Sequence, residues 1–519
     1  MSGKTTPPAK VACRAQIGLH APLVQVEVSL ATGLPAFSMV GLPATVVKES
    51  KERVRAALTN SNFEFPSGHI TVSLAPADLP KEGGRFDLPI ALGILIASGQ
   101  ITASANLRHT EFYGELGLAG ELRPVRGLLL AALNAAQRDH EIVVPSANAA
   151  EVLLACRAPI HAAEHLLDVC RHVVGTDPLP NYHSNRSRQL DAPPAQSAPL
   201  DLSDVRGQLH AKRALVVAAA GGHSLLMIGP PGSGKSMLAQ RLPGLLPALT
   251  TAESLEVASI ASISAVGFDE RSYGRRPFRA PHHTASAPAL VGGGSRARPG
   301  EASLAHHGIL FLDELPEFAR CTLEALREPL ESGVVSVSRA ALQAQYPAMF
   351  QLVAAMNPCP CGYHGDVSCD CRCTPAEVQR YRAKISGPLL DRIDMHVEVP
   401  RVDVGEFDDA AERGESTPCA AARVVRARQI QLRRQGGCNA RLADSQVERW
   451  CRPDRAARTI LDRSMRRLGL SARARVRVLK LARTIADLDE GEAVSASHVS
   501  QAIMLRCLDR APPTEEATA

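Results

Sequence analysis

A glycine-rich loop between a short apolar run and a helical pattern constrains the fold of this chain more than any other segment. Residues 225–228 are apolar and predict a buried strand, GPPGSGKS follows at residues 229–236, and residues 237–241 are typical of a helix. The loop matches the pattern GxxxxGKS/T in the strand, loop and helix context that the pattern requires. Backbone N–H groups of such a loop point at an anion, together with the N-terminus of the helix. We therefore expect an α/β fold with a phosphate site at this loop.

The residues of the loop would share the binding of a nucleotide. Lys235 would neutralise the β- and γ-phosphates, and Ser236 would be a ligand of Mg²⁺. A chance glycine turn is the alternative, which the flanking strand and helix disfavour. The expected nucleotide-binding residues are Gly229, Pro230, Pro231, Gly232, Ser233, Gly234, Lys235 and Ser236.

A second apolar run, at residues 308–312, ends in Asp313 and Glu314. Because ligands of an open parallel sheet bind at the carboxyl ends of its strands, both acids are expected near the phosphates. Asp313 would hold Mg²⁺ together with Ser236, and Glu314 would polarise the attacking water as a general base. These acids could instead only cap the next helix, an alternative that the phosphate loop disfavours. The sequence thus predicts an ATP hydrolase with ATP and Mg²⁺ as cofactors.

Composition and charge narrow the choice of partners. The chain has 519 residues, more than the roughly 250–300 that one hydrophobic core accommodates, so we expect several domains. Aromatic residues make up only 3%, which disfavours stacking on bases as the main mode of binding nucleic acid. The net charge is +5, yet residues 413–483 hold 18 Arg and one Lys against five acids. This segment predicts contact with a polyanion, although such arginines can also solvate helices or pair locally.

The sequence also bears on location and domain organisation. Since no apolar run approaches the ~20 residues of a membrane helix and the N-terminus lacks a signal-peptide core, we expect a cytoplasmic protein without membrane contact. Residues 1–175 mix β-like and helical runs, residues 176–200 are rich in Pro and Ser like a linker, and strands alternate with helices over residues 201–400. Residues 401–519 are predicted to be helical.

The strand predicted at residues 351–356 ends in Asn357, and this core resembles the AAA+ ATPases. The resemblance implies that Asn357 orients the attacking water. SGPLLDRID, at residues 386–394, is similar to the arginine-finger motif of the magnesium-chelatase branch, with Arg392 as the matching residue. An arginine finger acts on a neighbouring subunit's nucleotide, which implies a homohexameric ring. Arg473 matches the second sensor arginine of the branch's helical lid; without the resemblance, both arginines would be read as surface ion-pair partners.

Two longer segments, residues 276–318 and NPCPCGYHGD at residues 357–366, resemble the YifB/ComM family of magnesium-chelatase-like AAA+ proteins. The resemblance implies an ATP-driven hexameric helicase that promotes branch migration of DNA during natural transformation. Its expected partners are single-stranded and branched DNA, other copies of the chain, and recombination proteins. One alternative is the ATPase motor of a magnesium-chelatase-like complex that remodels a protein partner. A non-catalytic ATP-switched scaffold is another, which intact Lys235, Glu314 and Arg392 disfavour.

Arginines before and after the acidic strand are candidates for DNA contacts. The resemblance implies that the insertion at residues 271–298 and a hairpin near residues 333–339 line the pore of the ring. Flexible arginines suit phosphates, which carry no sequence information, although a solvated loop is the alternative. The candidate DNA-binding residues are Arg279, Arg296, Arg298 and Arg339.

Five of the 13 cysteines lie between residues 359 and 373. Two C-x-C pairs could give a closed tetrahedral site for structural Zn²⁺, whereas free thiols are the alternative in a reducing compartment. The candidate ligands are Cys359, Cys361, Cys371 and Cys373. The histidine pairs at residues 282–283 and 306–307 are disfavoured as ligands, because adjacent side chains rarely point the same way.

The N-terminal region resembles the proteolytic domain of Lon-type proteases over residues 76–99 and 113–136. That domain uses a serine nucleophile activated by a lysine. Here Arg85 stands where the serine should be and Leu129 where the lysine should be, and neither can do that chemistry. The predicted fold class is therefore an AAA+ P-loop α/β core with an α-helical lid. An α+β Lon-protease-like domain of the ribosomal S5 domain 2 type, without a protease site, precedes this core and would serve ring assembly or contacts with DNA and partners.

Overall fold

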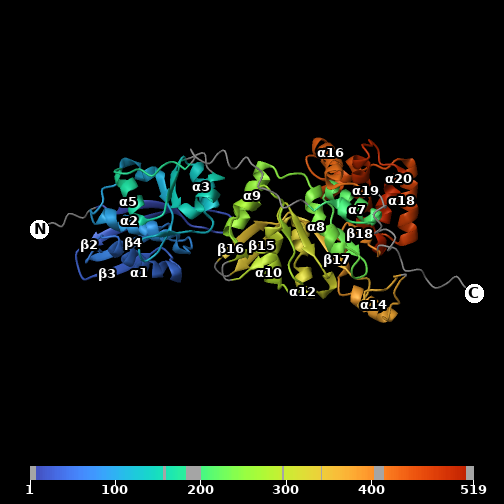
Figure 1. Ribbon diagram of the computed structural model, residues 1–519, viewed down its shortest axis with the longest axis horizontal. Helices are drawn as coiled ribbons and strands as arrows, with labels where there is room; N and C mark the ends of the chain where they lie inside the picture. The colour runs from blue at the N-terminus through green and yellow to red at the C-terminus, as the bar shows by residue number, and fades with distance from the viewer. Residues whose placement is uncertain are drawn as a thin grey trace, which may run out of the picture. The chain divides into compact units, whose positions relative to one another are not determined.

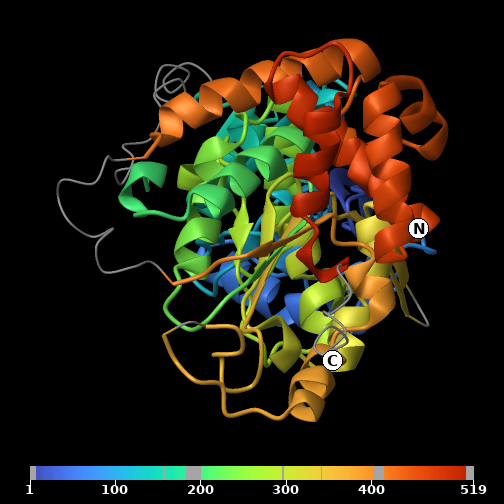
Figure 2. The ribbon, with the colours of Figure 1, turned by 90° about the vertical axis from the view of Figure 1, so that its right-hand side faces the viewer.

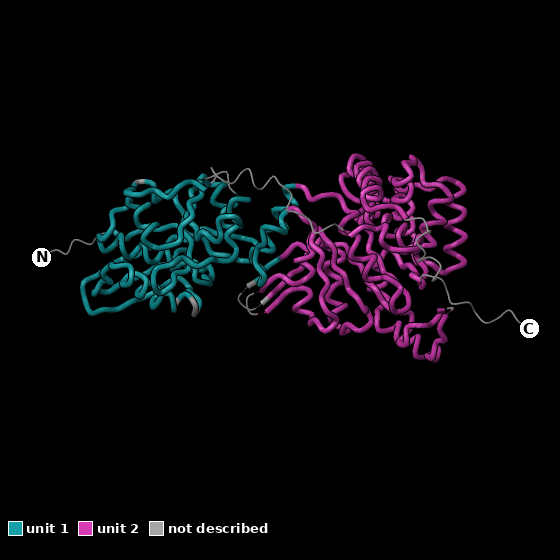
Figure 3. Tube along the Cα trace, in the orientation of Figure 1, with its two compact units in different colours: residues 1–195, 251–273, 340–345 teal, residues 196–250, 274–339, 346–519 magenta. Residues whose placement is uncertain are grey.

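The computed structural model describes residues 7–155, 159–182, 200–294, 297–339, 342–366, 368–401 and 414–509 (Figure 1). The chain forms two compact units (Figure 3). Unit 1 contains Met1–Ala195, Thr251–Tyr273 and Ala340–Gln345, and unit 2 contains Gln196–Thr250, Gly274–Arg339 and Tyr346–Ala519. Most of the predicted linker, residues 183–199, lies outside the described residues.

Unit 1 is built on a mixed seven-stranded sheet in the order β3-β4-β2-β1-β5-β8-β9. Strands β1 and β4 pair antiparallel with β2, and the remaining neighbours pair in parallel. The strands are β1 (Ala9–Arg14), β2 (Leu23–Ala31), β3 (Ala36–Val40), β4 (His69–Ala75), β5 (Thr110–Phe112), β8 (Glu141–Pro145) and β9 (Ile160–Ala163). A mixed sheet with separate helices is the α+β architecture that the sequence predicts.

Helix α2 (Asp87–Ala97) forms the centre of the core of unit 1, because the side chains from Leu88 to Leu95 are buried and pack against β1 and β2. Helix α9 (Thr251–Ile263) packs against α3 and belongs to unit 1, although it follows the phosphate loop in the sequence. The other elements of unit 1 are α1 (Thr45–Asn60), β6 (Glu115–Leu116), β7 (Leu122–Arg123), α3 (Leu128–Ala136), α4 (Ala149–Leu153) and α5 (Leu166–Val174).

Unit 2 contains a parallel five-stranded sheet in the order β11-β14-β17-β10-β18. The strands are β10 (Leu225–Ile228), β11 (Phe278–Arg279), β14 (Ile309–Leu312), β17 (Gln351–Met356) and β18 (Met395–Glu398). Every residue of β10, β14 and β17 is buried, as expected for a parallel sheet covered on both faces. Because these strands run in parallel, the residues that follow them meet at one edge, where ligands of such sheets bind.

Helices surround this sheet, and the C-terminal region is helical as predicted. Figure 2 shows the long α16 (orange) lying across green helices of unit 2, where it packs on α7 and α8. The helices of the core are α7 (Leu209–Gly221), α8 (Lys235–Leu245), α10 (Ala287–Val291), α11 (Glu301–Leu304), α12 (Arg320–Glu324), α13 (Arg327–Ser332), α14 (Pro375–Arg382) and α15 (Gly387–Leu390). The helical lid consists of α16 (Thr417–Gln435), α17 (Asp444–Trp450), α18 (Arg455–Leu468), α19 (Ala472–Leu488) and α20 (Ala496–Met504).

Short strands lie between β11 and β17 in the sequence. β12 (Gly292–Gly293) pairs with β13 (Arg298–Pro299), and β15 (Val334–Arg339) and β16 (Leu342–Pro347) form another two-stranded sheet. Within the described part of the chain, no helix is both long enough and apolar enough to cross a membrane.

Candidate nucleotide site

The phosphate loop occupies the turn from β10 to α8, at the carboxyl edge of the sheet. Gly229 has no space for a side chain, since a Cβ would lie 2.0 Å from the carbonyl oxygen of Val399. Gly232 and Gly234 adopt φ angles of 78° and 88°, in the left-handed region that favours glycine. Helix α8 begins at Lys235, so the loop and the first turn of the helix present their N–H groups together. This is the geometry of a phosphate site.

Lys235 lies inside the loop. Its Nζ donates to the carbonyl oxygens of Gly229 at 2.7 Å and Pro230 at 2.8 Å, and lies 3.4 Å from Oδ1 of Asn357. Burial lowers the pKa of Lys235, and the charge of Asp313 opposes this shift. Asn357 follows β17, the central strand of the sheet, which pairs with β10. The structure therefore brings Asn357 close to Lys235, as the sequence analysis expects.

Ser236 and Asp313 form the candidate magnesium site. The hydroxyl of Ser236, on the first turn of α8, donates to Oδ2 of Asp313 at 2.6 Å, and Asp313 follows β14. The second carboxylate oxygen of Asp313 accepts the backbone N–H of Glu314 at 2.9 Å. Hydroxyl and carboxylate oxygens are ligands that Mg²⁺ prefers, so the residues present fit the ion. When bound, Mg²⁺ would neutralise charge on the phosphate oxygens.

Glu314 has a neighbour that the sequence analysis did not identify. Its Oε2 lies 3.2 Å from Nδ1 of His283, and the Glu314 side chain is 57% exposed. His283 follows β11, the strand that pairs with β14, so both residues emerge at the carboxyl edge of the sheet. The ring of the adjacent His282 packs against that of His283, with centroids 4.1 Å apart, and its Nδ1 lies 2.9 Å from the hydroxyl of Thr284. Only the order of the strands in the sheet could have indicated the contact between His283 and Glu314, and local sequence patterns do not give that order.

Arg392 and Arg473 line one cleft of about 610 Å³, in which Arg477 and Lys480 also take part. The cleft lies at the amino edge of the sheet, because Ser224, directly before β10, donates its hydroxyl to the carbonyl oxygen of Arg392 at 3.1 Å. The phosphate loop follows the other end of β10, and a strand of this length spans about 13 Å. The structure therefore groups Arg392 with Arg473 and separates both from Lys235 of the same chain.

Acidic residues form ion pairs with the arginines that line this cleft. Arg392 is half-buried, donates to the carbonyl oxygen of Pro388 at 2.6 Å and forms an ion pair with Glu331 on α13. Asp394 accepts the backbone N–H of Ser224 at 3.1 Å and lies 3.8 Å from Arg477. Burial alone would raise the pKa of Asp394, but the hydrogen bond and charge of His223 and the charge of Arg477 hold it at about 2. Arg473 is exposed at the start of α19.

The candidate DNA-binding arginines have different surroundings. Arg279 forms a two-pronged ion pair with Glu301, at 2.6 and 2.8 Å, which raises the pKa of the guanidinium and ties β11 to α11. Arg298 belongs to β13 and is half-buried. Arg339 ends β15, but its side chain, like the whole of Arg296, lies outside what the structure describes.

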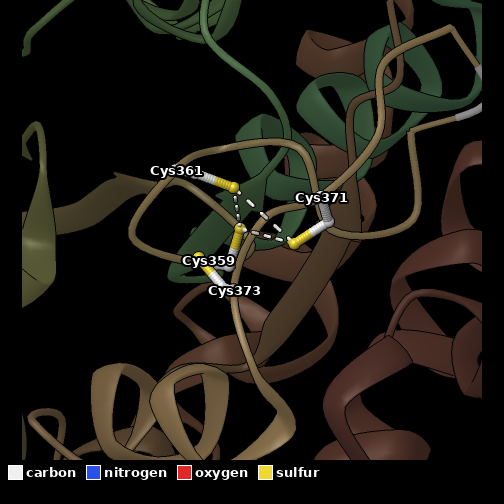
Figure 4. Close-up of side chains that lie close together, drawn as sticks. All are labelled: Cys359, Cys361, Cys371 and Cys373. Atoms are coloured by element: carbon white, nitrogen blue, oxygen red, sulfur yellow. Dashed lines mark hydrogen bonds between the residues drawn. The ribbon is translucent and has the colours of Figure 1, made fainter.

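The four predicted cysteine ligands lie together in the loop after Asn357 (Figure 4). The Sγ atom of Cys359 is 3.3 Å from that of Cys361 and 3.7 Å from that of Cys371, and all four sulfurs lie within 4.8 Å of one another. A tetrahedral zinc site with bonds of about 2.3 Å requires sulfur separations of about 3.8 Å. Backbone N–H groups of Tyr363 and Arg372 lower the pKa of Cys361 to about 6. The cluster fits a closed Zn²⁺ site.

In unit 1, Arg85 and Leu129 are both buried. The guanidinium of Arg85 donates to Oε1 of Gln16 and to the carbonyl oxygen of Arg126, each at 2.7 Å. Leu129 is packed in α3. The two positions of the Lon-like motifs thus carry a hydrogen-bonded cation and an apolar side chain, and they do not supply a nucleophile and a base.

Comparisons with known proteins cover most of the chain. Family profiles described as magnesium chelatase, subunit ChlI, match residues 26–148, 201–407 and, for its C-terminal part, 414–506. Competence protein ComM of Haemophilus influenzae is 47% identical over 502 residues, which are 97% of this chain and 98% of that protein. The chain belongs to the YifB/ComM family of magnesium-chelatase-like AAA+ ATPases.

Two further relatives differ in how much of the chain they match. The uncharacterized protein YifB of Salmonella typhimurium is 48% identical over 503 residues, 97% of each chain. The magnesium-chelatase 38 kDa subunit of Cereibacter sphaeroides is 29% identical over 177 residues, only 31% of this chain. The predicted AAA+ core with its helical lid is confirmed, and membership of this family implies an ATPase that uses ATP and Mg²⁺.

Proposed function

We propose that this YifB/ComM family member is an ATP-driven hexameric DNA motor that promotes branch migration of recombination intermediates during natural transformation. The observation that carries the proposal is the near full-length similarity to a protein named for competence, together with an assembled nucleotide site. Single-stranded and branched DNA would be its substrates, recombination proteins would be its partners, and the cytoplasm would be its place of action.

The position of Arg392 and Arg473 supports a ring. Both arginines line a cleft at the amino edge of the sheet, whereas Lys235 and Glu314 lie at the carboxyl edge of the same sheet. An arginine that stabilises charge on a transferring phosphate must reach that phosphate directly. Since β10 alone separates the two edges by about 13 Å, the partner of these arginines would be the nucleotide of a neighbouring subunit.

Exposed arginines on α18 support contact with the DNA backbone. Among the described residues, none of the exposed arginines of this helix forms an ion pair with an acid, which leaves their charges available to phosphates. They are Arg455, Arg458, Arg463, Arg466 and Arg467. Arg463, Arg466 and Arg467 stand at positions i, i+3 and i+4, so these three lie on one face of α18. Arg279, by contrast, is neutralised by Glu301 and is a weaker candidate.

Zinc is proposed at the four cysteines, with a structural role. Four protein ligands complete a tetrahedral site and leave no position for a reacting water. The Sγ separations support one ion bound by Cys359, Cys361, Cys371 and Cys373.

An ATPase motor for a magnesium-chelatase-like complex is the second candidate, favoured by the matching family profiles. An ATPase assay with and without DNA, beside a porphyrin-metalation assay, separates the two. The DNA motor predicts that single-stranded or branched DNA stimulates hydrolysis by the purified protein. Stimulation only by a chelatase partner, with metal insertion, would instead establish the second candidate.

A further inference from the structure

The cysteine loop is in direct contact with the phosphate loop. Gly362, next to Cys361, adopts a φ angle of 89°, and a Cβ built on it would lie 2.6 Å from Cδ and 2.9 Å from Cγ of Pro231. Pro231 is the third residue of GPPGSGKS. The two loops therefore approach so closely that there is no room for one methyl group between them.

The two loops are also linked through β17. Asn357 lies between this strand and Cys359, and its Oδ1 is 3.4 Å from Nζ of Lys235. Within the cysteine loop, Gly362 donates its N–H to the carbonyl oxygen of Cys359 at 3.0 Å. The position of Gly362 against the phosphate loop thus depends on the geometry around Cys359.

Other contacts fix the far side of the cysteine loop. Arg401, which follows β18, lies 3.3 Å from the carboxylate of Asp366, and its guanidinium lies over the ring of Tyr363. In the part of the loop that the structure describes, residues 358–366 and 368–374 form turns and bends without helix or strand. A segment of this kind has no core of its own, so a cross-link between its two C-x-C pairs would restrict its conformations strongly.

We propose that zinc bound by Cys359, Cys361, Cys371 and Cys373 braces the phosphate loop through the contact of Gly362 with Pro231, so that occupancy of the metal site sets nucleotide affinity. The proposal rests on the nucleotide and zinc sites proposed above. Coupling between two such sites is typically about 5–150-fold in affinity. Loss of the ion would free the cysteine loop, and the phosphate loop would lose a support on the side of Pro231.

Two glycines of the same loop give a matched test of the contact. Gly365 also has a left-handed φ, of 81°, but a Cβ there would meet no atom of the described residues within 4 Å. Gly362→Ala and Gly365→Ala therefore share the backbone penalty, and only the first pushes against Pro231. We expect both full-length variants to retain one zinc by atomic emission, and Gly362→Ala to bind a fluorescent ADP analogue at least about fivefold more weakly than Gly365→Ala. Equal affinities would overturn the proposed contact.

Cys371→Ser and Cys369→Ser test the role of the ion, since Cys369 lies outside the four-sulfur cluster. We expect Cys371→Ser to lose zinc and bind the ADP analogue at least about fivefold more weakly, while Cys369→Ser keeps both properties. Zinc loss with unchanged affinity would overturn the coupling, and a wild type that contains no zinc would overturn the metal site. Neither result depends on DNA, so a protein that binds nucleotide but does not move DNA would contradict only the proposed function.

Discussion

Nδ1 of His283 lies 3.2 Å from Oε2 of Glu314, and the two residues follow neighbouring parallel strands. Glu314 is largely exposed, so the imidazole restricts a carboxylate that would otherwise sample many rotamers. A misplaced general base loses rate even when the substrate still binds.

His283→Ala is therefore expected to lower the ATPase kcat about tenfold with little change in nucleotide affinity. His282→Ala is the matched control for the loss of a packed imidazole, because the His282 ring lies 4.1 Å from the His283 ring but interacts with Thr284 and not with Glu314. Steady-state hydrolysis and binding of an ADP analogue measure the two effects. Equal rates for the two variants would show that the pair does not position the base.

The proposed action of Arg392 on a neighbouring subunit predicts complementation. Arg392→Ala should reduce ATPase activity by about 10³-fold or more, as should Lys235→Ala, each in a homogeneous ring. In a mixed ring, some interfaces combine an intact Lys235 from one subunit with an intact Arg392 from the next. Partial recovery of activity on mixing the two variants is expected. Absence of recovery, when subunit exchange is shown by a labelled protomer, would contradict action between subunits.

Two pairs of arginines in the lid test the DNA contact at equal charge. Arg463 and Arg467 are exposed on α18, whereas Arg423 and Arg426 on α16 pair with Glu415 at 3.0 Å and Glu490 at 3.3 Å. For single-stranded DNA, the logarithm of the affinity falls linearly with the logarithm of the salt concentration. Changing Arg463 and Arg467 to Gln should make this slope less steep by about 1.4. The second double variant should change this slope little. Similar slopes for both, measured by fluorescence anisotropy, would place the DNA elsewhere.

Asp394 predicts a dependence of stability on pH. Its pKa of about 2 in the folded protein is below the ordinary value of 3.8, so its contribution is present above about pH 4 and is lost as the pH falls towards 2. The difference corresponds to about 2 kcal/mol at neutral pH. Asp394→Asn should therefore destabilise unit 2 at pH 7 and weaken the loss of stability between pH 4 and 2. Thermal unfolding of wild type and variant across this range measures both effects.

The phosphate loop, the acids after β14 and the cysteine cluster were predictable because the residues of each motif are close in sequence. Their neighbours across the fold were not. The approach of His283 to Glu314 depends on the pairing of β11 with β14, and the contact of Gly362 with Pro231 depends on the place of β17 beside β10. Likewise, Arg473 matched a family motif, but its position in a cleft with Arg392 follows from the packing of α19.

The division of the chain shows the same limit. Residues 251–273 follow α8 directly, and nothing in their pattern separates them from the ATPase core. In the structure they belong to unit 1, where α9 packs on α3 and Ser262 donates to the buried carboxylate of Glu151. Ser262 and Glu151 are more than a hundred positions apart, so no local sequence pattern predicts their contact.

Processing of a labelled three-strand DNA junction by the purified protein tests the central claim most directly. With ATP and Mg²⁺, the wild type should convert the junction to exchanged duplex and released strand. Glu314→Gln should bind nucleotide and DNA but leave the junction intact, because the attacking water lacks its general base. An unprocessed junction with wild type and variant alike, with no DNA-stimulated ATPase, would contradict the proposal that this chain is a branch-migration motor.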